Sequence, residues 1–110
     1  MRTILLLALF ILSALANTTT ACAELLRDKN NTGATVRVFK DIDAISHFKK
    51  MEQAGANDEN LITPLLACKA TQGSKIHVFS AGFETAFVRV VEGSAKGCEG
   101  TVPLDFVQRE

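Results

Sequence analysis

The C-terminal half of this 110-residue chain consists of short alternating runs, and this pattern constrains the fold more than any other feature. Apolar and polar residues alternate within Ser74–Phe79, Phe83–Val91 and Cys98–Val102. A period of two is typical of a strand with one buried face, and the glycine-containing segments between the runs favour turns. Short strands at close spacing with glycine turns predict a small β-barrel.

The segment before these runs is predicted to contain a further strand and a helix. Ala34–Lys40 alternates in the same way and predicts a strand. Asp41 fits an N-cap, and the residues after it place apolar side chains at helical spacing: Ile42, Ile45, Phe48 and Met51. Because Ala54–Gly55 is a typical helix stop, we expect one helix near Asp41–Gln53.

The connection from this helix to Ser74 is predicted to be a loop, a strand and a turn. Ala56–Asn60 is polar and typical of a loop. Leu61–Thr71 is an apolar strand-like run that is interrupted by Pro64, which lacks the N–H that a strand ladder requires. We therefore expect Pro64 at an edge or at a strand start, and a turn at Gln72–Gly73.

The first 23 residues have the pattern of a secretory signal peptide. A basic residue is followed by Ile4–Leu12, an apolar run that is too short to span a bilayer as a mature helix. Small residues then offer cleavage after Ala16 or after Ala23. The sequence therefore predicts a periplasmic or secreted protein without a transmembrane span.

The cysteine count depends on where this segment is cut. Cleavage after Ala23 removes Cys22 and leaves Cys68 and Cys98, which an exported protein usually joins in a disulfide. Such a bridge is worth roughly 3–4 kcal/mol on the chain-entropy account, which matters for a small domain. Cleavage after Ala16 would leave Cys22 unpaired, and a lipid anchor on Cys22 is a less favoured third outcome.

Removal of residues 1–23 leaves a nearly neutral chain. Only Arg2 is lost among the charged residues, so 11 basic residues face 12 acidic ones. This balance provides no basic footprint for nucleic acid. Residues 24–33 are polar and end in turn-forming residues, so we expect a flexible lead-in before a domain at 34–110.

The end of the chain resembles the end of SH3 domains. Gly100–Val107, with the sequence GTVPLDFV, resembles the run in which SH3 domains make a strand, a 3₁₀ turn and their last strand. Ala86–Gly93, followed by Gly97 and Gly100, resembles the valine strand and glycine loop of bacterial SH3-like domains. The resemblance covers the C-terminal half only, and it implies a mainly β, SH3-like small barrel with an inserted helix near 41–53.

The aromatic residues of a peptide-binding SH3 surface are absent from the sequence. The chain has no Trp and no Tyr, and Thr101 stands where bacterial relatives usually carry an aromatic residue. A polyproline helix docks in a groove lined by aromatic side chains. Of that groove only Pro103 and Phe106 carry over by position, so we expect no binding of PxxP peptides in the familiar manner.

The sequence contains no motif for catalysis or for a metal. His47 and His77 are the only histidines and are not at ligand spacing, while Asp41 and Asp43 are explained by helix capping. We therefore expect no enzyme activity and no cofactor. The sequence favours a non-catalytic, exported interaction module of the cell envelope that binds a protein or a cell-wall polymer such as peptidoglycan. The alternative is a small periplasmic inhibitor or immunity protein that blocks a secreted enzyme with a loop.

The resemblance implies one candidate binding surface near the end of the chain. In SH3-like barrels a partner usually binds between the loop that joins early strands and the turn before the last strand. By position this surface comprises Pro103 and Phe106 with the Ala56–Asn60 and Glu92–Gly97 loops, where Lys96 supplies charge.

A second candidate surface is an apolar stripe outside the barrel. Phe39, Phe83 and Phe87 lie on the strand faces opposite the predicted core and could receive a partner. The alternative is that the apolar face of the helix packs over this stripe. We favour the covered arrangement because such a helix face has to be buried somewhere.

Overall fold

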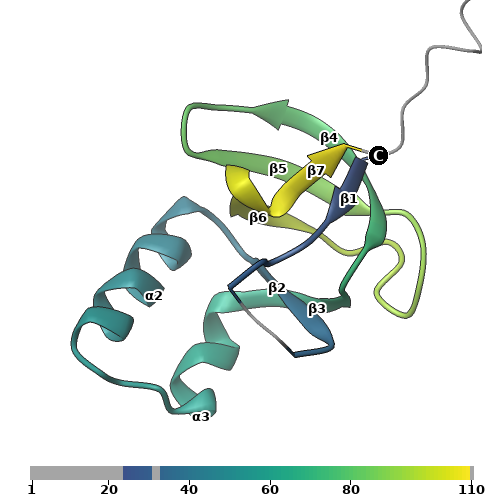
Figure 1. The fold of residues 1–110 in the computed structure, drawn as a ribbon. Helices are drawn as coiled ribbons and strands as arrows, with labels where there is room; N and C mark the ends of the chain where they lie inside the picture. Colours follow the sequence, from purple (N-terminus) through teal and green to yellow (C-terminus); the bar gives the residue numbers. More distant parts are fainter. Residues whose placement is uncertain (1–23, 31–32, 110) are drawn as a thin grey trace, which may run out of the picture.

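The computed structural model describes residues 24–30 and 33–109. The expected signal peptide at 1–23, its two cleavage positions and Cys22 lie outside these described residues. The described chain is mainly β, with its helices between the second and third strands (Figure 1). Within the described ranges, no helix has the length and apolar character needed to cross a membrane.

The strands form one open antiparallel sheet whose spatial order differs from the chain order. Their bounds are β1 Glu24–Leu26, β2 Thr35–Phe39, β3 Leu66–Thr71, β4 Ser74–Ala81, β5 Thr85–Val90, β6 Glu99–Pro103 and β7 Val107–Arg109. They lie side by side in the order β3-β2-β6-β5-β4-β1-β7. Strands β4, β5 and β6 therefore form a meander, and the first and last strands pair with each other beside it.

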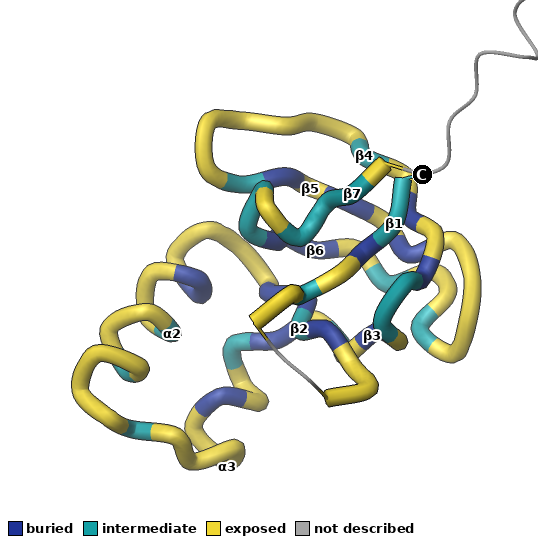
Figure 2. The backbone as a smooth tube through the Cα atoms, viewed as in Figure 1, coloured by how far each residue is buried: buried dark blue, intermediate teal, exposed yellow. Residues whose placement is uncertain are grey.

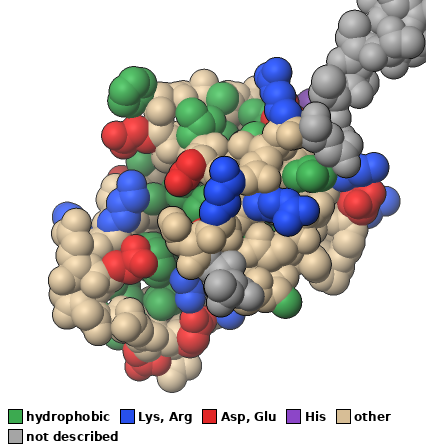
Figure 3. Space-filling view, viewed as in Figure 1, with side chains coloured by type: hydrophobic (Ala, Val, Ile, Leu, Met, Phe, Trp, Pro, Cys, Tyr) green, Lys and Arg blue, Asp and Glu red, His purple; other side chains and the backbone are tan. Residues whose placement is uncertain are grey.

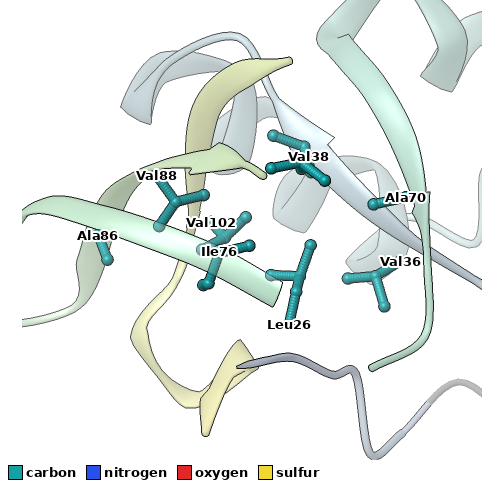
Figure 4. Close-up of a cluster of buried hydrophobic side chains, with 9 residues drawn as sticks. Leu26, Val36, Val38, Ala70, Ile76, Ala86, Val88 and Val102 are labelled. Carbon is teal, nitrogen blue, oxygen red and sulfur yellow. The ribbon is translucent and has the colours of Figure 1, made fainter. Parts of the chain in front are cut away.

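The core lies on one face of this sheet. In β5, Ala86, Val88 and Val90 are buried whereas Phe87 and Arg89 are exposed, as the period of two predicts. The same alternation of buried and exposed positions is visible along the tube in Figure 2. This core is built by side chains from β1 to β6, most of which are labelled in Figure 4: Leu26, Val36, Val38, Ala70, Ile76, Ala86, Val88, Val90 and Val102. Full burial of one such side chain is worth roughly 1.5–3 kcal/mol.

The predicted helix and both of its ends are confirmed. Helix α2 comprises Ile42–Gln53, and the Asp41 Oδ1 atom accepts a hydrogen bond of 2.8 Å from the backbone N–H of Ala44. Beyond its last turn, Gly55 has a φ of +75° and donates its N–H to the Glu52 carbonyl at 3.0 Å. Glycine adopts this left-handed conformation without strain, which explains why the helix ends here.

Helix α2 forms a second apolar cluster, separate from the core. Phe39, at the end of β2, is only 2% exposed and lies 5.3 Å from Phe48 between ring centroids. The buried members of this cluster come from β2, α2, the short helix α3 (Glu59–Ile62) and the start of β3: Phe39, Ala44, Ile45, Ile62 and Leu66. The apolar face of α2 is thus covered in part: Ile45 is buried, Phe48 and Met51 are half-buried, and Ile42 at the start of the helix is exposed.

Two expectations for the segments before β4 are wrong. Residues Glu24–Leu26 do not belong to a flexible lead-in: they form β1, which lies between β4 and β7, and Leu26 is fully buried. A strand of three residues is too short to show a readable alternation. The run Leu61–Leu65 is helical rather than extended, because α3 is followed by the 3₁₀ turn η1 (Thr63–Leu65) and β3 begins only at Leu66.

The helical path of this run has a local cause. The Asp58 Oδ1 atom accepts the N–H of Asn60 at 3.0 Å and caps α3. Pro64 then lies in the first turn of η1, where its missing N–H would be unpaired in any case. Asp58, which caps α3, and Pro64, which suits a first helical turn, therefore favour a helix in this segment. Its apolar residues are equally typical of a strand.

Strand β6 approaches β2 unusually closely at Gly100. A Cβ atom at this position would overlap the Phe39 carbonyl oxygen, and it would lie 2.7 Å from Val38 Cγ1 and 3.2 Å from Ala67 Cβ. Real Cβ atoms do not approach backbone this closely, so only glycine fits here.

The predicted disulfide is present and crosses this same region. Cys68 in β3 is bonded to Cys98, which immediately precedes β6, with a Cα–Cα distance of 6.5 Å. Because β2 lies between β3 and β6 in the sheet, the bridge ties β3 to the residue before β6 past the intervening strand.

Candidate functional site

A groove of about 410 Å³ lies beside α2 and the 3₁₀ turn η2 (Leu104–Phe106). In the space-filling view, hydrophobic side chains are visible between acidic and basic ones where α2 meets the rest of the molecule (Figure 3). Four parts of the chain line the groove: the β1–β2 connection (Asp28, Asn30), β2 (Arg37, Phe39), α2 (Ile45, Phe48, Lys49, Glu52) and the end of the chain (Pro103, Asp105, Phe106).

The aromatic wall of the groove is held by stacked groups. The rings of Phe39 and Phe48 are tilted by 47° at a centroid distance of 5.3 Å. The Arg37 guanidinium carbon lies 5.2 Å from the centroid of the Phe48 ring, which is within the range of a cation–π contact. The groove therefore combines an apolar wall with a fixed positive charge.

Glu59 fixes the position of Arg37. The Arg37 Nη2 atom donates to Glu59 Oε1 at 2.6 Å, and Lys69 Nζ donates to Glu59 Oε2 at 3.2 Å. The hydrogen bond from Arg37, followed by that from Lys69, holds the pKa of the Glu59 carboxyl below its ordinary value. These exposed contacts contribute little to stability, but they orient the guanidinium toward the groove wall.

The charges that line the groove are mixed. Two cationic side chains, Arg37 and Lys49, face three carboxyl groups of Asp28, Glu52 and Asp105. Mixed charge does not suit a polyanion, which requires several unopposed cations. The groove offers an apolar wall together with positively charged donors and negatively charged acceptors. This combination suits an extended polypeptide, which has N–H groups, carbonyls and side chains to contact them.

The described residues show no constellation that points to catalysis or to a metal. In residues 24–30 and 33–109 no three His, Cys, Asp or Glu side chains lie close enough together to hold an ion. Cys68 and Cys98 are bonded to each other and cannot act as thiolate nucleophiles. The lowered pKa of Glu59 is caused by exposed contacts with Arg37 and Lys69 and does not indicate a catalytic carboxyl.

The residues of the surface implied by the resemblance do not all lie together in the structure. Pro103 and Phe106 both line the groove, and Phe39 contributes to its wall as a nearly buried residue. Lys96 is exposed in the β5–β6 loop, before the first residue of β6, whereas Pro103 is the last residue of that strand. The length of β6 separates them by on the order of 16 Å, so Lys96 does not belong to the groove. The predicted Ala56–Asn60 loop contributes no lining residue.

The three phenylalanines of the predicted stripe also do not form one surface. Phe39 is buried under α2, as the favoured covered arrangement predicts, so it is not available to a partner as the exposed alternative required. Phe87 is 40% exposed, and its ring lies 5.4 Å from that of Phe79 between centroids. Phe83 is 95% exposed in the turn between β4 and β5.

Sequence reasoning missed four residues of these surfaces. Phe48 was predicted as part of a helix face, and no local signal places its ring against the groove. Arg37 and Glu59 are 22 positions apart, so their contact depends on the fold and has no sequence signal. Phe79 was placed in a strand, but its pairing with Phe87 depends on a register shift between Val78 and Ser80.

No protein-family model matches this chain, and no curated protein or solved structure does so either. Function must therefore be inferred from two features of the described residues. These are the groove beside α2 and the aromatic side chains that remain exposed on β4, β5 and their turn.

Proposed function

We propose that this chain is a non-catalytic, exported binding module of SH3-like architecture, whose groove receives an extended segment of a partner protein of the cell envelope. One observation carries the proposal. The groove lies between the long connection that joins β1 to β4 and the 3₁₀ turn that precedes the last strand. SH3-like barrels usually bind their partners in the corresponding place.

The order of the strands supports the SH3-like assignment. Strands β7, β1, β4, β5 and β6 are neighbours in this order, and η2 lies between β6 and β7 in the chain. The strand, 3₁₀ turn and final strand coincide with the GTVPLDFV segment that resembles SH3 domains. Strands β2 and β3 and the helices are then an elaboration of the connection between β1 and β4.

The composition of the groove supports a protein segment as the ligand. Phe48 and Phe106 offer apolar contact, and Pro103 adds a rigid apolar edge. The absence of Trp and Tyr argues against the polyproline mode, in which prolines insert between flat aromatic ridges. We infer a ligand with one or two apolar anchors and at least one charged group opposite Lys49 or Asp105.

Export is supported by the disulfide. Stable disulfides are rare in reducing compartments and common in exported small domains. The bond between Cys68 and Cys98 therefore agrees with the signal-like N-terminal sequence. The non-catalytic role is proposed because both described surfaces offer binding groups without a paired acid and base or an activated nucleophile.

A pair of neighbouring lysines provides a matched test of this proposal. Lys49 lines the groove, whereas Lys50 is exposed on α2 and does not. Tagged wild-type protein, Lys49→Glu and Lys50→Glu are used to capture partners from an envelope extract of the source cells, with mass spectrometry of the captured proteins. The wild type and Lys50→Glu should retain one stoichiometric protein that Lys49→Glu loses. Capture of the same protein by all three would show that the groove is not the site.

Phe106→Ala then measures the apolar contribution of the groove once the partner is purified. Truncation of a central interface anchor typically costs about 2 kcal/mol, which is roughly a 30-fold loss of affinity. Phe106 is partly buried, so the thermal unfolding of the Phe106→Ala variant has to be measured together with its affinity for the partner. A loss of affinity no larger than the loss of folded protein would contradict an anchoring role.

An inhibitor is the second candidate function, and the β4–β5 turn favours it. Phe83 is 95% exposed at the tip of this hairpin, in a position from which it can enter a pocket of an enzyme. Phe83→Ala should abolish inhibition of such an enzyme while Lys49→Glu leaves it intact. The reverse pattern would favour the groove.

A further inference from the structure

The sheet face over β4 and β5 carries two exposed aromatic rings that no described helix covers. Phe79 is 45% exposed and Phe87 is 40% exposed, with ring centroids 5.4 Å apart and ring planes 31° apart. We call these two rings and their polar neighbours His77, Arg89 and Glu99 the aromatic platform. By contrast, Phe39 at the end of β2 is buried by α2 and its neighbours. Neighbouring exposed aromatics on a rigid sheet therefore require an explanation of their own.

The rings of the platform are held in place by defined contacts. The Arg89 guanidinium carbon lies 5.2 Å from the Phe79 centroid, and Arg89 Nε and Nη2 donate to Glu99 Oε2 at 3.0 and 2.8 Å. His77 meets the Phe79 ring in an edge-on arrangement at 4.9 Å. The aromatic face is thus preorganised, which lowers the entropic cost of binding a ligand there.

A β-bulge produces this arrangement. The register of β4 against β5 shifts between Val78 and Ser80, so that Val78 pairs with Val88 but Ser80 pairs with Phe87. Phe79 is the extra residue, and Ser80 is consequently placed beside Phe87 on the same face. Bulges commonly redirect a side chain at functional positions, and here the bulge places Ser80, which carries a hydroxyl, opposite Phe87.

The charged groups around the platform compensate one another. Arg89 is paired with Glu99, and Lys75 lies 3.8 Å from Glu92 at the far end of β4 and β5. A polyanion would require unopposed cations, and a strongly basic partner would require unopposed carboxylates. The platform therefore suits an uncharged ligand that has both an apolar face and many hydrogen-bonding groups.

We propose that the aromatic platform binds an uncharged glycan chain. The C–H face of a pyranose ring stacks on an aromatic side chain, and its hydroxyl groups both donate and accept hydrogen bonds. The Arg89–Glu99 pair, His77 and Ser80 offer such partners around the two rings. This site goes beyond the groove proposed above, because the two share no lining residue.

The test uses the purified full chain with a defined saccharide. ¹⁵N-labelled protein is titrated with the N-acetylglucosamine hexamer, and with cellohexaose as a second uncharged chain, and the shifts of the backbone amides are followed. We expect saturable shifts confined to β4, β5 and β6 for at least one of them. Phe79→Ala and Phe87→Ala should each weaken binding about tenfold, since each removes one stacking surface.

Conservative and distant variants separate this proposal from its rivals. Phe87→Leu keeps apolar area but removes the flat ring, so it should weaken glycan binding as Phe87→Ala does, whereas a general hydrophobic contact would survive it. Lys49→Glu and Phe83→Ala should not change the titration, which separates this site from the groove and from the hairpin tip. Absence of saturable shifts with both saccharides, or equal binding by Phe79→Ala and the wild type, would overturn the proposal. Concentration-dependent shifts of the platform without any saccharide would overturn it in favour of self-association.

Discussion

Substitution of Gly100 by alanine is the sharpest structural test of how β6 packs on β2. The added methyl group would overlap the Phe39 carbonyl oxygen and lie 2.7 Å from Val38 Cγ1. Val38 is fully buried in the core and the carbonyl belongs to the backbone, so neither can move aside freely. Relief requires β6 to move away from β2 at the position where Phe39 pairs with Thr101.

The magnitude follows from these contacts. Overpacking a well-packed core usually costs about 1–3 kcal/mol, and occasionally more. Because one of the two close contacts is backbone, we expect Gly100→Ala to lose about 3 kcal/mol of unfolding free energy. A domain of this size has roughly 4–13 kcal/mol in total, and the midpoint of thermal unfolding should fall by roughly 12–24 °C.

Urea unfolding followed by far-UV circular dichroism measures this loss, because the chain lacks Trp and Tyr for a fluorescence signal. Gly82→Ala is the matched control. Its Cβ would be 3.6 Å from the nearest atom, the Thr85 carbonyl oxygen, and its φ lies outside the left-handed region. Gly82→Ala should therefore be neutral or stabilising by up to about 1 kcal/mol. A loss below about 1 kcal/mol for Gly100→Ala would refute the close approach of β6 to β2.

Three further predictions concern the disulfide, the helix cap and the ion pair of Glu59. Cys68→Ala should destabilise the protein by about 2–5 kcal/mol in urea unfolding, and the intact mass of the unreduced wild type should show no free thiol at this pair. Asp41→Ala should cost about 1 kcal/mol because the Ala44 N–H loses its acceptor, whereas Asp43→Ala should cost less, as judged by thermal unfolding. In an NMR pH titration, the pKa of Glu59 should lie below its ordinary value and should rise in Arg37→Ala; an unchanged value would contradict the contact. Since folding lowers this pKa, the small stabilisation by Glu59 should be present above its unfolded pKa and should be lost as the pH falls through the folded value.

The parts of the fold that depend on local chemistry could be predicted from the sequence. Helix α2 was predicted because Asp41 and Gly55 fit the two helix ends and the apolar residues between them recur at helical spacing. Strand β5 was predicted because its core residues alternate with polar ones. The disulfide was predicted from the number of cysteines that remain if residues 1–23 are removed.

The parts that depend on long-range pairing could not be predicted. Strand β1 has three residues, and only its neighbours β4 and β7 identify it as a strand. Phe79 lies beside Phe87 in the aromatic platform because of a β-bulge, and no residue of β4 predicts that bulge. The groove joins α2 to η2, which are about 50 positions apart, so its lining could be named only in part from Pro103 and Phe106.

The pairing of β1 with β7 has a consequence for how this chain reaches its native state. Glu24–Leu26 can pair with Ser74–Ile76 of β4 first, but the ladder between β1 and β7, and with it the sheet, is complete only when Val107–Arg109 are available. Domains dominated by contacts between distant parts of the sequence fold slowly, because the entropy of closing a long loop is lost before the contact is gained. The meander of β4, β5 and β6 and the Cys68–Cys98 bond can form first, since they need only residues up to Pro103. The three residues of β7 then complete this edge of the sheet as the final step of assembly, and their truncation should leave the outer side of β1 as a new, unpaired edge.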